Sequence, residues 1–246
     1  MRLKLQIILG ILLIGLTIGF SVWNLNRSGF FNLTNTDVIV ENFADQKNYL
    51  APLIAQVNTS MTPYMGQSLW SISPEKVAQS VESLPWVQEV RVSVRWPVSL
   101  RIQIVAKEVA LLLVHHNGTL MPVTKEGELL PPVSANHSPS VVLLQGEVFE
   151  KQKEQRQKAI EVIQSIPAQG NFSQKNISEI HYDTQEGFWI HLVGSGLRVN
   201  LGQDQVMTKS LRVSQVLNYL DEHQMDARVI DANLSKKVLV RLRKGP

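Results

Sequence analysis

Residues 84–104, LPWVQEVRVSVRWPVSLRIQI, decide the fold of the first half of this chain. Before Pro97, valines at every second position alternate with charged or small polar residues. After Pro97, aliphatic residues again occupy every second position. A period of two predicts amphipathic strands that each have one apolar face. Trp96-Pro97 interrupts the pattern, so the sequence predicts a hairpin of two strands with one dry face.

The segments before this hairpin supply helices that can cover its apolar face. We expect a strand near 37–42, a helix around 46–57 and a second helix that begins at Ser73-Pro74-Glu75. A serine N-cap, a proline at the first helical position and an acidic residue after it are typical of a helix start. Residues 37–106 therefore predict the order β-α-α-β-β, with a helical layer on one sheet face.

The chain opens with a long apolar segment. Leu5–Trp23 has no charged residue, and a helix of this length extends over about 28 Å, which matches one hydrocarbon core. Arg2 and Lys4 favour a cytoplasmic N-terminus. The segment is longer than the apolar part of a cleaved signal peptide and lacks a good cleavage site after it. We expect a cytoplasmic tail at 1–4, a transmembrane helix at 5–23 and a linker at 24–34.

The second half of the chain is rich in predicted strands and has two predicted helices. Asn117-Gly118 indicates a hairpin, and Gly194-Ser195-Gly196 predicts a turn between two further strands. One helix is expected at Lys151–Ile166 and the other after Asp204, which we expect to cap it. The predicted strands lie at 110–114, 141–144, 177–182, 188–193, 197–201, 228–231 and 238–242. The fold class is therefore α+β, with a first domain at 35–106 and a β-rich domain at 107–246.

Composition excludes several classes of function. The chain has 246 residues, no cysteine and a formal net charge of +3. Without cysteine it can form neither disulfides nor thiolate metal sites. Its basic residues are dispersed without long runs, which argues against nucleic-acid binding. The sequence contains no phosphate-binding loop and no dinucleotide fingerprint, so we expect no cofactor and no small-molecule substrate.

Histidines and one serine are the candidates for chemistry. His115 and His116 are adjacent at the end of a predicted strand, where neighbouring side chains point to opposite faces, so we expect no shared metal ion. We find no ligand-spaced carboxylate or histidine near His181 or His191. Ser195 lies directly between two glycines and between strands, unlike the nucleophile elbow of hydrolases. We therefore expect a protein that is not an enzyme.

Two surfaces are candidates for binding another protein. The last predicted strand is expected to form a sheet edge, whose N–H and C=O groups can accept another strand. Its basic side chains either blunt the edge or dock an acidic partner. The second surface is the 84–104 hairpin, whose basic face is either solvated or a dock. The predicted contacts are Leu234, Ser235, Lys236, Lys237, Val238, Leu239, Val240, Arg241 and Leu242 at the edge, and Glu89, Arg91, Val92 and Arg95 on the hairpin.

The order of these parts and several motifs resemble the FtsQ/DivIB family of bacterial division proteins. The resemblance is strongest at Leu84-Pro85-Trp86-Val87, Arg95-Trp96-Pro97 and Leu100-Arg101-Ile102, which match the signature of that family's POTRA domain. Further matches are Asp37-Val38-Ile39-Val40, Gly66-Gln67-Ser68-Leu69-Trp70, Val199-Asn200-Leu201-Gly202 and Val229-Ile230-Asp231. The chain departs from the family at Leu234, which replaces a tyrosine.

The resemblance implies a single-pass protein of the inner membrane at the division septum, with most of the chain in the periplasm. It implies a POTRA domain and a β-domain whose last strand pairs with an FtsB- or DivIC-type protein, with FtsL as a further partner. The implied role is a scaffold that links early and late division proteins and helps control septal peptidoglycan synthesis. Two alternatives are a POTRA-containing periplasmic chaperone or assembly or secretion component, and a hydrolase that uses Ser195 with His191 or His181.

Overall fold

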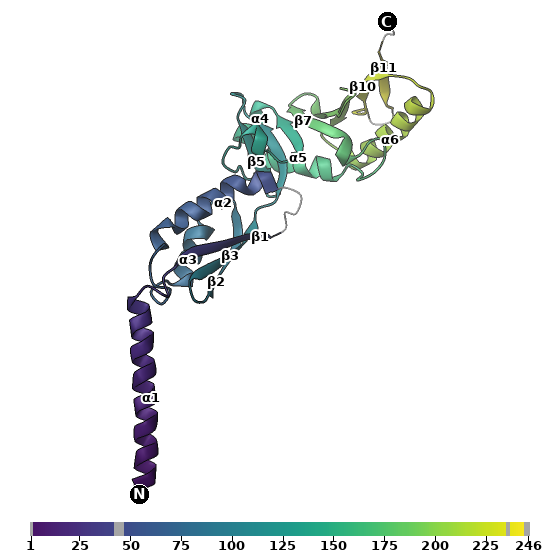
Figure 1. Ribbon diagram of the computed structural model, residues 1–246. Coiled ribbons are helices and arrows are strands. Elements are labelled where there is room, and N and C mark those ends of the chain that lie inside the picture. The colour runs from purple at the N-terminus through teal and green to yellow at the C-terminus, as the bar shows by residue number, and fades with distance from the viewer. Residues whose placement is uncertain (1, 42–46, 235–236, 244–246) are drawn as a thin grey trace. The chain divides into compact units, whose positions relative to one another are not determined.

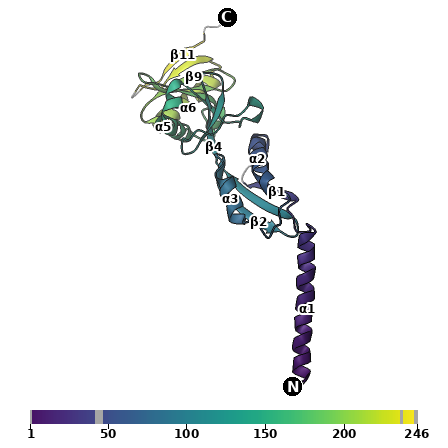
Figure 2. The ribbon, with the colours of Figure 1, turned by 90° about the vertical axis from the view of Figure 1, so that its left-hand side faces the viewer.

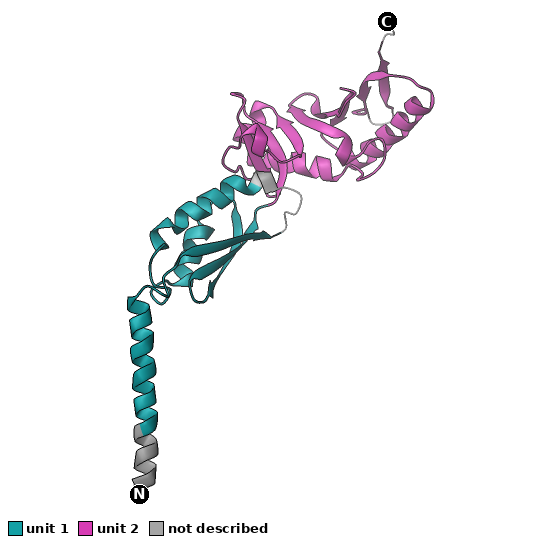
Figure 3. Ribbon diagram, viewed as in Figure 1, with its two compact units in different colours: residues 1–107 teal, residues 108–246 magenta. Residues whose placement is uncertain are grey.

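The computed structural model describes residues 2–41, 47–234 and 237–243, without the side chains of 2–9 and 47–49. The chain divides into two compact units, residues 1–107 and 108–246 (Figure 3). The first unit contains a long N-terminal helix and a small sheet with two helices, and the second contains a large sheet with helices (Figure 1). The predicted α+β class is confirmed in both units.

Helix α1 (Arg2–Arg27) includes the segment predicted to span a membrane. From Gly10 onward its side chains are exposed, among them Ile11 and Phe20. A search of the described residues finds no helix that is long and apolar enough to cross a membrane. The side chains of the first five residues of the predicted segment, 5–9, lie outside the described part. The helix continues to Arg27, so the first part of the expected linker is helical.

The sheet of the first unit has three strands in the order β1-β3-β2. Its strands are β1 (Asn35–Glu41), β2 (Val87–Arg95) and β3 (Ser99–Ala106). β2 and β3 form the predicted antiparallel hairpin, in which Arg95 lies opposite Ser99. β1 pairs with the other side of β3 in parallel. Every second residue of β3 is buried, as the period of two predicts; these residues are Leu100, Ile102, Ile104 and Ala106.

Helices α2 (Lys47–Met61) and α3 (Pro74–Glu82) complete this core. The predicted start of α3 is confirmed, because Ser73 Oγ accepts the backbone N–H of Lys76 at 3.3 Å. α3 packs against β2, and Figures 1 and 2 both show the two elements side by side. The buried Val57 of α2 and Val77 of α3 belong to the apolar core of this unit. The observed order is the predicted β-α-α-β-β.

The second unit is built on an eight-stranded sheet in the order β11-β10-β9-β8-β7-β6-β4-β5. The strands are β4 (Val109–Val114), β5 (Leu120–Thr124), β6 (Val142–Gln145), β7 (Ile177–Asp183), β8 (Gly187–Leu192), β9 (Arg198–Gly202), β10 (Ala227–Asp231) and β11 (Leu239–Leu242). β6 and β7 are parallel, as are β9 and β10. Each of these two connections contains helix, since parallel neighbours need a crossover. The first holds α4 (Glu147–Lys151) and α5 (Lys153–Gln164), and the second holds α6 (Val206–Glu222).

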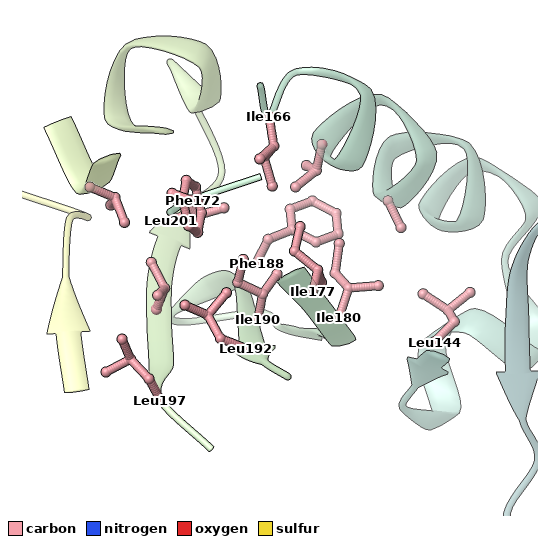
Figure 4. Packing of buried hydrophobic residues seen from close by; sticks show 14 of the residues in the cluster. Leu144, Ile166, Phe172, Ile177, Ile180, Phe188, Ile190, Leu192, Leu197 and Leu201 are labelled. Atoms are coloured by element: carbon pink, nitrogen blue, oxygen red, sulfur yellow. The ribbon is translucent and has the colours of Figure 1, made fainter. Parts of the chain in front are cut away.

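Alternate residues of the central strands form the core of this unit. Ile180 of β7 and Ile190 of β8 are fully buried, and Figure 4 shows them in a cluster with Ile166 and Phe172. The intervening residues of β7 and β8 are only partly buried. They lie on the other sheet face, which is therefore the place where polar and aromatic side chains of these strands gather.

One short helix was not predicted, and one expectation about a helix start is wrong. The helix predicted at 151–166 is confirmed as α5, whereas the short helix α4, which the extended Gln152 (φ −117°, ψ 112°) separates from α5, was not predicted. Asp204 does not cap α6, because Gln205 precedes the helix in a left-handed conformation (φ 49°) without a side-chain cap. Instead, an Asp204 carboxylate oxygen accepts a hydrogen bond from Lys209 Nζ at 2.7 Å.

Candidate partner-binding surfaces

β11 is an edge strand. On one side it pairs with β10 in antiparallel orientation, with Val240 opposite Ile230 and Leu239 opposite Asp231. Within the described residues, no strand pairs with its outer side. The prediction that the last strand forms a sheet edge is confirmed.

The hydrogen bonds of β11 show which backbone groups point outward. The N–H of Arg243 donates to the Asp226 carbonyl at 2.9 Å, on the side of β10. Backbone groups of successive residues in a strand point to opposite sides. Val240 and Leu242 therefore direct their N–H and C=O groups away from β10. A strand from another protein would pair with these groups.

The side chains of this edge combine positive charge with apolar surface. Lys237 and Arg241 are exposed, and Leu239 and Leu242 are about half exposed. Val238 and Val240, on the face of β11 that also carries Leu242, pack against the core. Leu234 is exposed in the connection after β10, whereas the predicted contacts Ser235 and Lys236 lie outside the described residues. The edge thus presents two cations and two leucines beside its outward backbone groups.

The opposite edge of the same sheet is covered. At β5, the N–H of Leu130 donates to the Pro122 carbonyl at 2.8 Å, and the N–H of Val133 donates to the Leu120 carbonyl at 2.9 Å. Residues 128–133 thereby occupy the outer side of β5. Pro122 also lacks an N–H, which weakens that strand as a template. In the part of the chain that the structure describes, the β11 edge has no such cover.

The second predicted surface lies on β2, which is an edge of the three-stranded sheet. Glu89, Arg91 and Arg95 are exposed, and Val92 is half buried on the other face. Arg91 Nη2 lies 2.7 Å from Glu89 Oε1, and this hydrogen bond raises the pKa of the Arg91 guanidinium. The cation of Arg91 is therefore partly neutralised by its neighbour, which leaves Arg95 as the more available positive charge.

An exposed aromatic cluster lies at the start of the first unit. The rings of Trp70 and Trp96 are 4.5 Å apart, and Phe31 lies about 6 Å from both. Trp70 is 62% exposed and Trp96 51%. The motifs around both tryptophans are visible in the sequence, but their contact depends on the fold, and sequence reasoning missed it.

The structure brings together a second group that the sequence analysis missed. Glu179 Oε2 lies 3.0 Å from His181 Nε2 and 3.3 Å from His191 Nδ1. Burial opposes ionisation of Glu179, but hydrogen bonds from the two histidines outweigh it, so the pKa of Glu179 is lowered. Burial lowers the pKa of His181, partly offset by Glu179. The expectation of no ligand-spaced group near these histidines is wrong.

His115 and His116 also share a carboxylate. His115 Nε2 and His116 Nδ1 each lie 3.2 Å from Glu150 Oε2. The expectation that the two rings point to opposite faces is wrong, because β4 ends at Val114 and both histidines follow it outside regular strand.

Ser195 lies in the turn between β8 and β9, as predicted. Its Oγ accepts the N–H of Leu197 at 3.2 Å, while His181 and His191 both contact Glu179. This arrangement gives the serine a role in the turn itself.

Two family models match the two units. The POTRA domain of FtsQ type matches residues 55–105, and the C-terminal model of the cell division protein FtsQ/DivIB matches residues 112–233. The chain belongs to the FtsQ/DivIB family of cell division proteins. The family resemblance predicted from the 84–104 segment is thereby confirmed.

Individual relatives in the FtsQ/DivIB family are distant in sequence. The cell division proteins FtsQ of Geobacter sp. (strain M21) and Geotalea daltonii are 25% and 21% identical over 183 residues, which cover 72% of this chain. FtsQ of Syntrophotalea carbinolica is 22% identical over 187 residues. The matched region spans 66% of the length of each of these relatives.

Proposed function

We propose that this protein is a non-enzymatic scaffold of the division machinery that binds FtsB- or DivIC-type and FtsL-type partners. In this proposal it links early and late division proteins and helps control septal peptidoglycan synthesis. Membership of a division-protein family supports the role in division, because both units match models of that family. The partners follow from the family resemblance and from the chemistry of the open β11 edge.

The observation that carries the proposal is the contrast between the two edges of the large sheet. Residues 128–133 cover β5, whereas β11 keeps outward backbone groups at Val240 and Leu242. An uncovered edge is a liability for aggregation, and proteins retain one where another chain binds. Lys237 and Arg241 favour a partner strand with acidic residues. The hairpin residues Glu89, Arg91, Val92 and Arg95 are proposed as a second contact surface, nearer the N-terminal helix in sequence.

We further propose that α1 anchors the chain in the inner membrane, with its N-terminus in the cytoplasm and the residues after α1 on the periplasmic side. Large apolar side chains of α1 are exposed, and Trp23 and Arg27 lie together near its end, 5.5 Å from ring centroid to guanidinium carbon. Tryptophan and arginine favour the interfacial region of a bilayer. This placement puts the POTRA unit next to the membrane.

Charge reversal at the edge tests the proposed dock. We expect Lys237→Glu with Arg241→Glu to weaken binding of the full chain to an acidic FtsB-like segment roughly tenfold at low salt, since rim charges chiefly affect association. The matched control is Lys158→Glu with Lys175→Glu, which makes the same charge change at exposed sites on α5 and before β7. Isothermal titration measures the affinities. An unchanged affinity removes the edge as the dock but leaves the division scaffold in place.

A further inference from the structure

The hairpin of β7 and β8 brings three potential metal ligands, one glutamate and two histidines, to one point on the outer sheet face. Glu179 and His181 are two residues apart, so they lie on the same face of β7. The strand register places His191 of β8 directly opposite Glu179. Their ligand atoms all lie within 4.8 Å of one another. Two adjacent strands, rather than loops, therefore hold all three side chains.

The spacing of the donor atoms fits a small tetrahedral ion. Bonds of about 2.0–2.1 Å from zinc to nitrogen or oxygen put neighbouring donor atoms about 3.3 Å apart. Glu179 Oε2 is 3.0 Å from His181 Nε2 and 3.3 Å from His191 Nδ1. Two imidazoles and one carboxylate are a known zinc donor set that leaves a fourth position for water. Hard cations such as Mg²⁺ and Ca²⁺ prefer oxygen ligands.

The neighbouring side chains hold the His181 ring in position. Trp189 stacks on it with ring centroids 3.7 Å apart and planes 6° apart. The Arg198 guanidinium lies over the same tryptophan at 4.2 Å. Arg198 is itself paired with Glu186 and donates to Asn200, so its positive charge is balanced close by. Fixed ring orientation of this kind favours metal binding because it lowers the ordering cost.

We propose that Glu179, His181 and His191 form a binding site for Zn²⁺ or a similar borderline divalent ion. The ion would cross-link β7 and β8 at the centre of the large sheet. The site lies in the β-domain and on strands other than β11, and it is independent of the proposed partner dock.

The second group, His115, His116 and Glu150, is a weaker candidate. The His116 side chain is 72% exposed, and the two histidines belong to a turn rather than to paired strands. By contrast, the side chains of Glu179, His181 and His191 are 16–33% exposed. The second group serves as an internal comparison, because it has the same donor types in a looser setting.

The experiment uses the untagged full chain in mild detergent, stripped of metal with a chelator. Isothermal titration with ZnCl₂ should show that the wild-type chain binds zinc, and the variants then test whether the ion binds at Glu179. Glu179→Gln and, separately, His191→Asn should each abolish the binding of one zinc ion or lower its affinity at least about tenfold. Glu150→Gln is the matched control and should leave that zinc in place. Circular dichroism of the metal-free variants checks that each remains folded.

Co²⁺ gives a second measurement that does not depend on any variant. A tetrahedral nitrogen and oxygen site should produce visible ligand-field bands in the wild-type chain, and Zn²⁺ should abolish them by displacing the cobalt. MgCl₂ and CaCl₂ at the same concentration should not. The proposal is overturned if the wild-type chain binds neither ion, or if folded Glu179→Gln and His191→Asn retain all the zinc that the wild type binds.

Discussion

At the residue scale, the ion pair of Lys209 and Asp204 is unequal in burial. The Lys209 side chain is 3% exposed and that of Asp204 is 74% exposed. Lys209 Nζ donates to Asp204 at 2.7 Å and to Asn233 Oδ1 at 3.3 Å. The charge of Lys209 is thus stabilised inside the protein by groups from both ends of the α6–β10 segment. Loss of the carboxylate would leave that cation poorly compensated.

This pair predicts a pH-dependent effect of Asp204→Asn. The Lys209 hydrogen bond lowers the pKa of Asp204 below its unfolded value of 3.8. The stabilisation is therefore complete above pH 3.8 and is lost as the pH falls through the lower folded pKa. Asp204→Asn should reduce the urea midpoint at pH 7, and the difference from wild type should disappear in acid. The exposed Asp221→Asn should give no comparable loss, and a pH-independent effect of Asp204→Asn contradicts this account.

Other residue-scale features lie beyond what the sequence could predict. Arg156 is 7% exposed and donates to the Gly127 and Phe149 carbonyls at 2.8 and 2.6 Å. Nothing in the pattern of its helix distinguishes it from the exposed Lys158. Glu179 and His181 have a visible spacing of two, but His191 joins them only through the β7–β8 register. Long-range contacts of this kind are fixed by the turn and by core packing, not by local periodicity.

At the scale of the element, β11 predicts a backbone test of strand addition. Leu242 directs its N–H outward, so Leu242→Pro removes an outward donor without removing a β10–β11 hydrogen bond. Proline is tolerated on an edge when its nitrogen faces solvent. One lost strand hydrogen bond, about 1 kcal/mol, and the steric effect of the ring should weaken an incoming strand at least about fivefold.

The matched control for this test is Leu242→Ala, which shortens the half-exposed side chain and keeps the N–H. Surface plasmon resonance with an immobilised FtsB-like segment would compare the two variants with the wild-type chain. Equal affinities of the proline and alanine variants would contradict strand addition at β11, even if charge reversal still weakened binding.

The elements themselves were largely predictable from local patterns. The alternation in 84–104 predicted the β2–β3 hairpin, and Asn117-Gly118 predicted the turn between β4 and β5. The arrangement of strands was not predictable, because β6 inserts between β4 and β7 by a crossover. The five-residue helix α4 was missed because so short a segment shows no helical periodicity of its own. The position of β11 at a sheet edge was predicted from the sequence and is observed.

At the scale of the whole molecule, the aromatic cluster lies where α1 leads into the rest of the first unit. Ser68 Oγ donates to Asn26 Oδ1 at 2.7 Å, and Asn32 forms a β-bridge with Ser68. These contacts hold the end of α1 beside the segment that carries Trp70. Aromatic rings that stay exposed to water favour aggregation, so an exposed aromatic cluster indicates contact with a membrane or with another protein. If α1 is a membrane anchor, the rings of Trp70 and Trp96 lie at the height of the lipid headgroups.

This placement predicts contact between the cluster and lipid. In vesicles that contain the full chain, brominated phospholipids should quench part of the tryptophan emission, because such lipids quench only nearby rings. Trp70→Phe with Trp96→Phe should lower the quenched fraction, since both rings favour the interface. Trp189→Phe is the control, because Trp189 stacks on His181 in the β-domain and its loss should not reduce quenching. Quenching that is unchanged in the double variant would show that the cluster faces water, and its exposed rings would then indicate a protein contact instead.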